Sequence, residues 1–273
     1  MTALIEVAEL TKRFRVGRLG RRVERVAVDG VSFSVEPGTT FGLVGESGSG
    51  KTTVARVLCR FVRPDGGQVL VDGIDVATIA GAALTRFRRR VQLVFQDPFA
   101  SLDPRWKVGA LVAEGMRIHG HVPPPQRRDK VLELLDRCGL AADHADRFPH
   151  EFSGGQRQRI SIARALAVEP DILVLDEPVS ALDVSIRAQI LNLLTDLQAD
   201  LGLTHVLIAH DLAVVERCCH QIAVMQQGRI VEHGPADQLF RAPAHPYTRS
   251  LLEAIPVPDP ARRRARAPGG AIP

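Results

Sequence analysis

A glycine-rich loop between an apolar strand and a helix constrains this chain more than any other feature. Residues 45–52 read G-E-S-G-S-G-K-T, which matches the phosphate-loop pattern G-x-x-x-x-G-K-[ST]. The apolar run at residues 40–44 predicts a buried strand before the loop, and the run at residues 54–58 predicts a helix after it. This strand–loop–helix order is the context that the pattern needs, so we expect a nucleoside triphosphate site in an α/β fold.

The residue types within this loop suit phosphate binding. Glycine at positions 48 and 50 lets backbone N–H groups face an anion, and the helix that starts near Lys51 adds its positive N-terminal end. Lys51 is expected to reach the β- and γ-phosphates, and the Thr52 hydroxyl to bind Mg²⁺. A plain glycine-rich turn is the alternative. The predicted nucleotide contacts of this segment are Gly45, Glu46, Ser47, Gly48, Ser49, Gly50, Lys51, Thr52 and Thr53.

The length and composition of the chain predict a globular protein of a reducing compartment. It has 273 residues and is 45% hydrophobic, enough for one large domain or a domain with a subdomain. No run of about 18 apolar residues and no N-terminal signal pattern is present, so we expect a cytoplasmic location. The four cysteines form no C-x-x-C pair, which argues against zinc and favours free thiols: Cys59, Cys138, Cys218 and Cys219.

The net charge argues against nucleic acid as the main partner. The chain carries a formal +4, and most of it comes from an arginine cluster near its end, Arg262, Arg263, Arg264 and Arg266. The body of the protein is therefore close to neutral. Prolines and small residues surround this cluster, which predicts a disordered, solvated tail; contact with anionic lipid headgroups is the alternative.

Two kinds of patterning divide the chain. The early strands follow one another across short turns at 36–38 and 64–67, which predicts an antiparallel β portion. Later strands alternate with helices, which predicts a mainly parallel sheet, and the helical middle is expected to be an insertion beside it. Strands are expected at residues 4–14, 26–35, 40–44, 68–71, 91–95, 171–175, 205–209, 221–225 and 229–232, and helices at 108–138 with a break at 123–125, 154–168, 184–201 and 212–219.

Two adjacent carboxylates follow the apolar strand expected at residues 171–175. Burying such a pair is costly unless a cation offsets the charge, and Mg²⁺ bound with the nucleotide is the natural cation. Asp176 is expected to hold Mg²⁺, and Glu177 to act as general base toward the attacking water. An acidic helix-capping turn is the alternative.

Other polar residues also follow predicted strands. His210 ends the apolar run 206–209, at the strand end where ligands of open α/β sheets bind, and could donate a hydrogen bond from Nε2 to a γ-phosphate. Gln96 follows the strand before the helical insertion, and its amide could bind Mg²⁺ or the attacking water. Taken alone, a structural histidine and a surface glutamine are the default interpretations.

A second anion-binding helix start is predicted far from the loop. Ser153 is a good N-cap, and Gly154, Gly155 and Gln156 follow it at the start of a helix. One nucleotide has one γ-phosphate, so this second terminus suggests that it serves a nucleotide on another copy or partner.

These motifs together carry a family resemblance. The phosphate loop, Gln96, F-S-G-G-Q at residues 152–156, I-L-V-L-D-E at 172–177, S-A-L-D at 180–183 and His210 occur in the order typical of ABC transporters. Nearly the whole chain resembles their nucleotide-binding subunit. The resemblance implies a P-loop NTPase (RecA-like) α/β fold, a mainly parallel sheet with an antiparallel β subdomain and an α-helical insertion. It also implies adenine stacking on Phe14, or plain strand core there as the alternative, and a nucleotide contact at Asp183.

Three longer sequence segments resemble those of the dipeptide/oligopeptide/nickel import branch of this family. They are V-F-Q-D-P-F-A-S-L-D-P-R at residues 94–105, R-F-P-H-E-F-S-G-G-Q at 147–156 and H-P-Y-T at 245–248. The short end makes the chain look more like the second ATPase of the pair. Cys219 is the last cysteine, so the iron–sulfur cluster of some members is not expected. Phe152 stands where leucine is commoner, and Phe14 where many relatives have tyrosine.

The resemblance implies an ATP-hydrolysing importer subunit and its partners. These are a second homologous ATPase subunit in a nucleotide-sandwiched heterodimer or homodimer, two transmembrane permease subunits and, indirectly, an extracytoplasmic solute-binding protein. The cofactors are ATP and Mg²⁺, the cargo peptides or a nickel chelate, and the location the cytoplasmic face of the membrane. A soluble ABC-family ATPase of repair or translation is the alternative. The predicted units are residues 1–91 with 170–242, the helical subdomain 92–169, and the extension 243–273.

Overall fold

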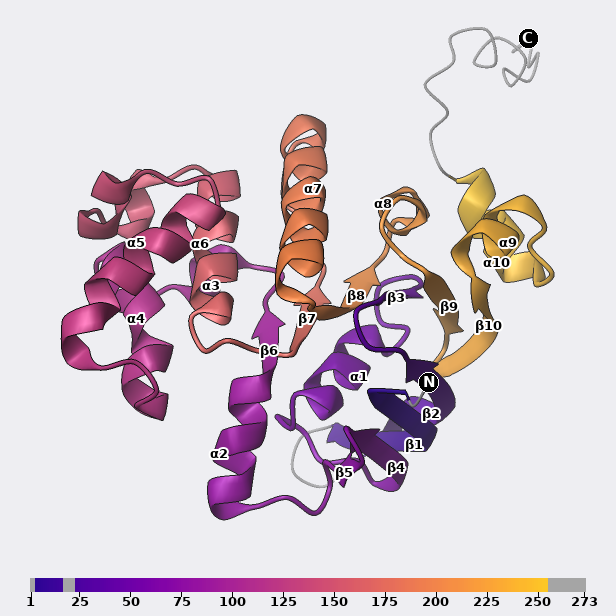
Figure 1. Ribbon diagram of the computed structural model, residues 1–273. Coiled ribbons are helices and arrows are strands. Elements are labelled where there is room, and N and C mark those ends of the chain that lie inside the picture. The colour runs from indigo at the N-terminus through magenta and orange to yellow at the C-terminus, as the bar shows by residue number, and fades with distance from the viewer. Residues whose placement is uncertain (1–2, 17–22, 255–273) are drawn as a thin grey trace, which may run out of the picture.

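Two β-sheets with different strand directions organise the protein (Figure 1). The computed structural model describes residues 3–16 and 23–254. The basic tail predicted around Arg262–Arg266 lies outside the described residues.

The smaller sheet is antiparallel, as the closely spaced early strands predict. Its four strands lie in the order β2-β1-β4-β5. The bounds are β1 Ile5–Val16, β2 Val23–Val35, β4 Gly66–Val71 and β5 Ile74–Asp75.

The larger sheet confirms the predicted α/β fold class. Its six strands lie in the order β10-β9-β3-β8-β7-β6, and all neighbours are parallel except β10 and β9. The bounds are β3 Thr40–Val44, β6 Val91–Val94, β7 Ile172–Asp176, β8 Thr204–Ala209, β9 Gln221–Gln226 and β10 Arg229–Pro235.

The parallel sheet is buried on both faces, which explains its unbroken apolar strands. Side chains of a strand point alternately to the two faces, and β7 shows this directly. Ile172 and Val174 belong to the hydrophobic cluster that includes helix α1 and the antiparallel sheet. Leu173 and Leu175 belong to the cluster that includes the helical middle of the chain. The sheet therefore joins two cores.

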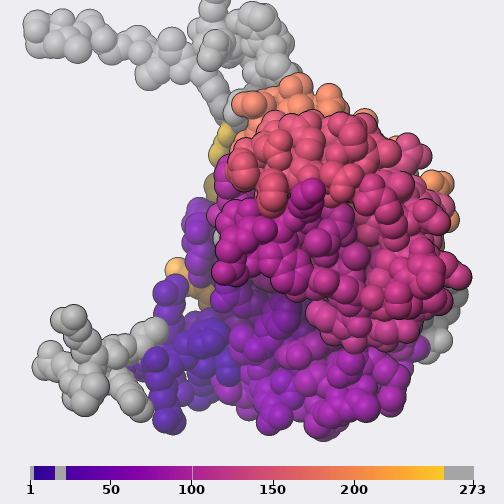
Figure 2. Space-filling view, turned by 90° about the vertical axis from the view of Figure 1, so that its left-hand side faces the viewer, coloured from indigo at the N-terminus to yellow at the C-terminus, as the bar shows by residue number. Residues whose placement is uncertain are grey.

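Helices cover both faces of this sheet. Helix α1 contacts β7 and β8 on one side, whereas α3, α4, α5 and α6 pack on one another and reach the sheet through β6 and α7 (Figure 1). In Figure 2 this helical group, coloured magenta to rose, forms a rounded surface above the purple residues around α2. The helices are α1 Lys51–Leu58, α2 Gly81–Arg90, α3 Pro98–Ser101, α4 Val108–His119, α5 Arg127–Arg137, α6 Gly154–Leu166, α7 Val184–Leu201, α8 Leu212–Glu216, α9 Ala236–Arg241 and α10 Pro246–Glu253, with short 3₁₀ turns at Pro124–Gln126, Ala142–Asp146 and Pro149–Glu151.

Several element predictions need correction. The helix expected at 212–219 ends at Glu216, because Arg217 and the residues after it lead directly into β9. Gly67, expected in a turn, lies inside β4 with φ 78°, where a Cβ would come within 2.2 Å of the Glu9 carbonyl oxygen. The glycine is therefore needed for a close approach of β4 to an irregular part of β1. Helix α2 was not predicted, because only Leu84 and Phe87 mark its apolar face.

No helix within residues 3–16 and 23–254 is long and apolar enough to span a membrane. The division into units 1–91 with 170–242, 92–169 and 243–273 stays a prediction. The buried residues of one hydrophobic cluster all lie in the first of these units, whereas the other cluster combines buried residues of the first two.

Tight packing between α6 and α7 generates a stability prediction. A Cβ at Gly155 would lie 2.5 Å from Cγ2 of Ile186, whereas a Cβ at Gly154 would lie 3.4 Å from Cδ2 of Leu182. We expect Gly155→Ala to lower the free energy of unfolding by about 1–2 kcal/mol, because Ile186 must move. Gly154→Ala is the matched control in the same helical turn and should be close to neutral. Urea unfolding measures both, and equal stability of the two variants would contradict this packing argument.

Candidate functional site

The phosphate loop is held by close backbone packing on two sides. Gly45 has φ 155°, and a Cβ there would lie 2.0 Å from the Met225 carbonyl oxygen. Gly50 has φ 111° and caps α1, and a Cβ there would lie 2.2 Å from the Ala27 carbonyl oxygen. Both positions combine a left-handed backbone with contact to another strand, so glycine is required at each.

The loop borders an open cavity of about 580 Å³, a size suited to a small-molecule ligand. Gly48, with φ 82°, lines this cavity, and a Cβ there would come no closer than 3.7 Å to a side chain from another segment. The residues around the cavity come from β1, β2, the phosphate loop, α1 and the ends of three strands of the parallel sheet. They are Phe14, Arg25, Ala27, Ser47, Gly48, Gly50, Lys51, Thr52, Thr53, Gln96, Glu177 and His210.

Lys51 is the buried cation of the site. Its Nζ donates hydrogen bonds to the carbonyl oxygens of Gly45 and Glu46, both at 2.7 Å. Burial lowers the pKa of Lys51, and the carboxylates of Glu177, Asp176 and Glu46 oppose that shift. A cation in this setting is stabilised by an anion, which is what the cavity beside it would receive.

Asp176 lies at the end of β7 with only 6% of its surface exposed. Its Oδ1 accepts a hydrogen bond from the Thr52 hydroxyl at 3.1 Å. Burial raises the pKa of this carboxyl, the Thr52 hydrogen bond lowers it, and the neighbouring Glu177 raises it further. Because burial disfavours the ionised form of this carboxyl, a bound cation would stabilise it.

Glu177 contacts two other predicted catalytic residues, Gln96 and His210. Its backbone has φ 48°, a conformation uncommon for a residue with a side chain, and its N–H donates to the Ile208 carbonyl oxygen at 3.0 Å. Oε2 of Glu177 accepts hydrogen bonds from Nε2 of Gln96 at 3.0 Å and from Nδ1 of His210 at 3.2 Å. Within the described part of the chain Nε2 of His210 has no hydrogen-bond partner, and this is the nitrogen expected to donate to a phosphate.

The β1–β2 hairpin supplies the opposite wall of the cavity. Phe14 is 36% exposed, so its ring is not enclosed in the strand core, and Nζ of Lys12 lies 5.4 Å from the ring centroid. Arg25, which sequence reasoning did not single out, pairs with Phe14 across the hairpin. One of its guanidinium nitrogens lies 3.7 Å from where a Cβ of Gly48 would be. Only strand pairing brings Arg25 here, so no local pattern could have identified it.

The second predicted anion site lies away from this cavity. Ser153 caps α6 through a reciprocal pair: its Oγ accepts from the N–H of Gln156 at 3.3 Å, and Oε1 of Gln156 accepts from the N–H of Ser153 at 3.0 Å. Gly155 is buried against Ile186, so tight packing, as well as the proposed contact with an anion, favours a glycine at this position. The predicted metal ligand Asp176 does not line the cavity, but it contacts Thr52, which does. The predicted nucleotide contacts that do not line the cavity are Gly45, Glu46, Ser49, Ser153, Gly154, Gly155, Gln156 and Asp183.

The donor set fits Mg²⁺ held together with a phosphate. Among the described residues, no three histidine, cysteine or acidic side chains gather as a metal site. Mg²⁺ in phosphoryl-transfer sites usually takes only one or two carboxylates, with phosphate oxygens and water as further ligands. The Thr52 hydroxyl and the Asp176 carboxylate, 3.1 Å apart, form such a minimal set, and the amide oxygen of Gln96 is available nearby.

Comparisons with known proteins agree with this geometry. Residues 28–180 match the family model described as ABC transporter, and residues 231–273 match that of the oligopeptide/dipeptide transporter, C-terminal region. The chain is 52% identical over 264 residues to the glutathione import ATP-binding protein GsiA of Escherichia coli K12 and to that of Shigella dysenteriae serotype 1. The match covers 96% of this chain but only 42% of each relative, so the chain spans less than half of their length.

Solved structures show the same fold. A dimeric, post-hydrolysis ATP-binding cassette bound to ADP and Pi aligns with a TM-score of 0.76 at 29% identity, over 85% of this chain and 98% of that one. The cbiO1 protein of Clostridium perfringens, part of the ABC transporter complex cbiONQ, aligns with a TM-score of 0.77 at 27% identity, over 89% and 92% of the two chains.

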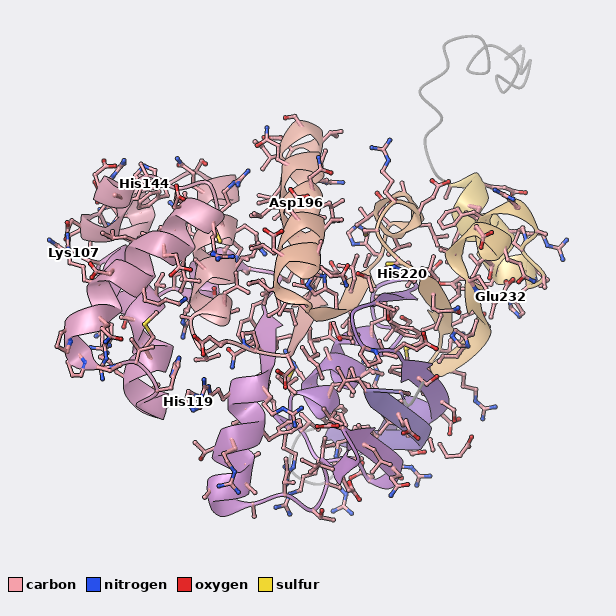
Figure 3. The ribbon with its side chains drawn as sticks, viewed as in Figure 1. Lys107, His119, His144, Asp196, His220 and Glu232 are labelled. Carbon is pink, nitrogen blue, oxygen red and sulfur yellow. The ribbon has the colours of Figure 1, made fainter. Side chains whose placement is uncertain are left out.

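The raised pKa of Asp176 generates a pH-dependent stability prediction. At neutral pH and without added nucleotide, the folded protein carries the Asp176 carboxylate buried, so Asp176→Asn should raise the free energy of unfolding by about 1 kcal/mol. Because the pKa is raised on folding, the gain should vanish below the ordinary pKa of aspartate, where both states are protonated. The exposed Asp196→Asn on α7 (Figure 3) is the control and should show neither effect. Urea unfolding at about pH 7.5 and about pH 3.5 measures the difference; a loss of stability at neutral pH would contradict the argument.

Proposed function

The chain belongs to the ABC transporter family, in its oligopeptide/dipeptide branch, and we propose that it hydrolyses Mg·ATP to drive an importer for peptides. The observation that carries the proposal is the arrangement of Gln96 and His210 on one oxygen of Glu177, at the rim of the cavity that the phosphate loop borders. Family membership supports ATP as the ligand.

Different residues of the cavity have separate roles in the transfer of a phosphoryl group to water. Lys51 exchanges its carbonyl partners for phosphate oxygens and offsets their negative charge. Glu177 accepts a proton from the attacking water, and Gln96 and His210 keep its carboxylate directed into the cavity. Thr52 and Asp176 would hold Mg²⁺, which supplies further charge neutralisation when bound. Phe14 would stack on adenine, since its partly exposed ring offers a face.

The site of one chain lacks the second set of anion donors. Ser153, Gly154 and Gly155 lie outside the cavity, and so does Asp183 at the start of α7. We infer that they complete the cavity of a second homologous subunit, in a heterodimer or a homodimer. The dimeric cassette bound to ADP and Pi supports this arrangement, because its chain superimposes on most of this one. Hydrolysis would then require that the dimer closes.

A groove between the helical group and the sheet provides a surface for a permease subunit. Phe61, Phe95 and Ile118 are exposed apolar side chains along it, and the rings of Phe61 and Phe95 stack with centroids 6.4 Å apart. Figure 3 shows His119, another residue of the groove, at the end of α4. Phe95 directly precedes Gln96, so a segment bound in this groove would touch the chain neighbour of the residue that contacts the Glu177 carboxylate. Movement of the proposed helical subdomain, residues 92–169, would pass the effect of hydrolysis to two membrane permeases from their cytoplasmic face.

The cargo is proposed from the family branch and its relatives. The branch name indicates oligopeptides or dipeptides, and the 52% identical relatives are named for glutathione import, itself a small peptide. Peptides of this size are therefore the proposed cargo, delivered by an extracytoplasmic solute-binding protein, with a nickel chelate as the alternative. Uptake of labelled glutathione, a dipeptide and a nickel chelate by cells with and without this chain would separate the three.

Replacing the proposed general base should separate binding from hydrolysis. Glu177→Gln keeps the shape of the side chain and removes its proton acceptor, so we expect at least a 100-fold lower ATP turnover with ATP binding retained and a trapped dimer. The exposed Glu36→Gln is the matched control and should behave as the unchanged protein. Turnover of the assembled complex and its elution with ATP on size exclusion measure both effects; unchanged turnover in Glu177→Gln would falsify the assignment.

A charge in the groove should disturb assembly with the membrane without disturbing nucleotide binding. Ile118 is 69% exposed in the groove, and Ile118→Arg places an unpaired charge where an apolar partner surface is proposed. We expect several-fold less of this variant in the membrane fraction of cells that express the complete transporter, with the same affinity for Mg·ATP. Ile74→Arg, at a 41% exposed position on the antiparallel sheet, is the control. Equal membrane association of the two variants would contradict the proposed surface.

A further inference from the structure

The last described helix is attached to the edge of the parallel sheet through one carboxylate. Glu232 lies on β10, and Figure 3 shows it beside the C-terminal helices. Its Oε1 accepts a hydrogen bond from the N–H of Ala244 at 2.7 Å, and its Oε2 accepts one from the N–H of His245 at 3.0 Å. Two successive backbone groups are therefore held by both oxygens of one side chain, immediately before α10 begins.

The first turn of α10 is fixed in direction as well. His245 caps the helix, because its Nδ1 accepts a hydrogen bond from the N–H of Tyr247 at 3.2 Å, and Pro246 occupies the first helical position. Thr248 is fully buried, and the ring of Tyr247 packs against the larger hydrophobic cluster. Anchor, cap and packing together determine where the Tyr247 hydroxyl lies.

That hydroxyl contacts the phosphate loop. The backbone N–H of Glu46 donates a hydrogen bond to the Tyr247 oxygen at 3.1 Å, between residues 201 positions apart in the chain. Burial raises the pKa of Tyr247, so the group is a neutral hydroxyl at physiological pH. Neither residue lines the cavity, and the contact therefore leaves the nucleotide's space open.

The same loop segment accepts the hydrogen bonds of the Lys51 ammonium. Nζ of Lys51 donates hydrogen bonds to the carbonyl oxygens of Gly45 and Glu46. These two carbonyls flank the Glu46 N–H, which donates to the Tyr247 oxygen. The N–H of Ser49 also donates to the Glu46 carbonyl oxygen, at 3.2 Å. Lys51 has to leave these carbonyls to reach a phosphate, and at that step the Tyr247 contact keeps the Glu46 peptide in place.

We propose that Tyr247 is a positioning residue for the phosphate loop, through which the C-terminal helix strengthens nucleotide binding. A loop already held in its binding conformation loses less conformational entropy when the ligand arrives. The proposal rests on the proposed function of the loop as an ATP site. It also gives the C-terminal region a role within the same chain, in addition to any contact with other subunits.

The hydroxyl can be tested alone. Tyr247→Phe keeps the ring and its packing, and we expect the Kd for Mg·ATP to rise about 3- to 10-fold, the size of one hydrogen bond. In the assembled complex, KM should rise by a similar factor with kcat unchanged, because the contact is the same in the ground and transition states. The melting temperature without nucleotide should fall slightly, as expected for the loss of one hydrogen bond, and the rise that Mg·ATP causes should shrink.

Two further variants separate positioning from helix stability. Ser250→Ala also removes a hydroxyl from α10, one that donates within the helix to the Tyr247 carbonyl oxygen at 2.8 Å, and should leave the Kd unchanged. Glu232→Gln replaces one accepting oxygen by an NH₂ group and should shift the Kd in the same direction by a smaller factor. An unchanged Kd in Tyr247→Phe, or an equal loss in Ser250→Ala, overturns the inference. Failure of the unchanged protein to bind Mg·ATP would instead overturn the proposed function.

Discussion

The nearly buried ammonium of Lys51 is the charge on which the arrangement of the site depends. An isolated charge in a protein interior costs several kcal/mol, so the chain has to surround it with acceptors. Two loop carbonyl oxygens accept its hydrogen bonds, and the carboxylates of Asp176 and Glu177 stand near it at the end of β7. Each of these carboxylates is in turn constrained by other groups. Burial disfavours the charged forms of Lys51 and Asp176, and a bound phosphate and divalent cation would stabilise these charges.

Close backbone contact is what holds that charge in place. The loop approaches β2 at Gly50 and β9 at Gly45 so closely that a single methyl group would collide with a carbonyl oxygen. Such contacts leave the loop little room to move, and they connect it to both sheets. The left-handed backbone conformation of Glu177 is also energetically unfavourable. It places the Glu177 carboxylate within hydrogen-bond distance of both Gln96 and His210. Local strain and catalytic geometry occur at the same residue.

The two ends of the described chain meet at this loop. The β1–β2 hairpin contributes Phe14 and Arg25 to one wall of the cavity, and the C-terminal helix contributes the Tyr247 contact on its outer side. The sheet order explains how, since β3 lies between β9 and β8 and its loop emerges close to the β9–β10 edge that carries α10. Nucleotide affinity and the placement of the C-terminal region are thereby physically connected.

Much of this protein follows from its sequence alone, because local patterns carry their own physical reasons. The apolar runs around residues 40–44 and 172–175, the helix at 184–201 and the glycines of the phosphate loop predict the α/β class and the first part of the site. Acids and polar residues after strands predict Asp176, Glu177 and His210, since parallel strands end at one edge. What the tertiary structure decided are contacts between segments far apart in the chain: Arg25 across from the loop, Tyr247 on Glu46, and the packing demand on Gly155. No local pattern records such contacts, because they depend on strand register and on which helix faces which strand.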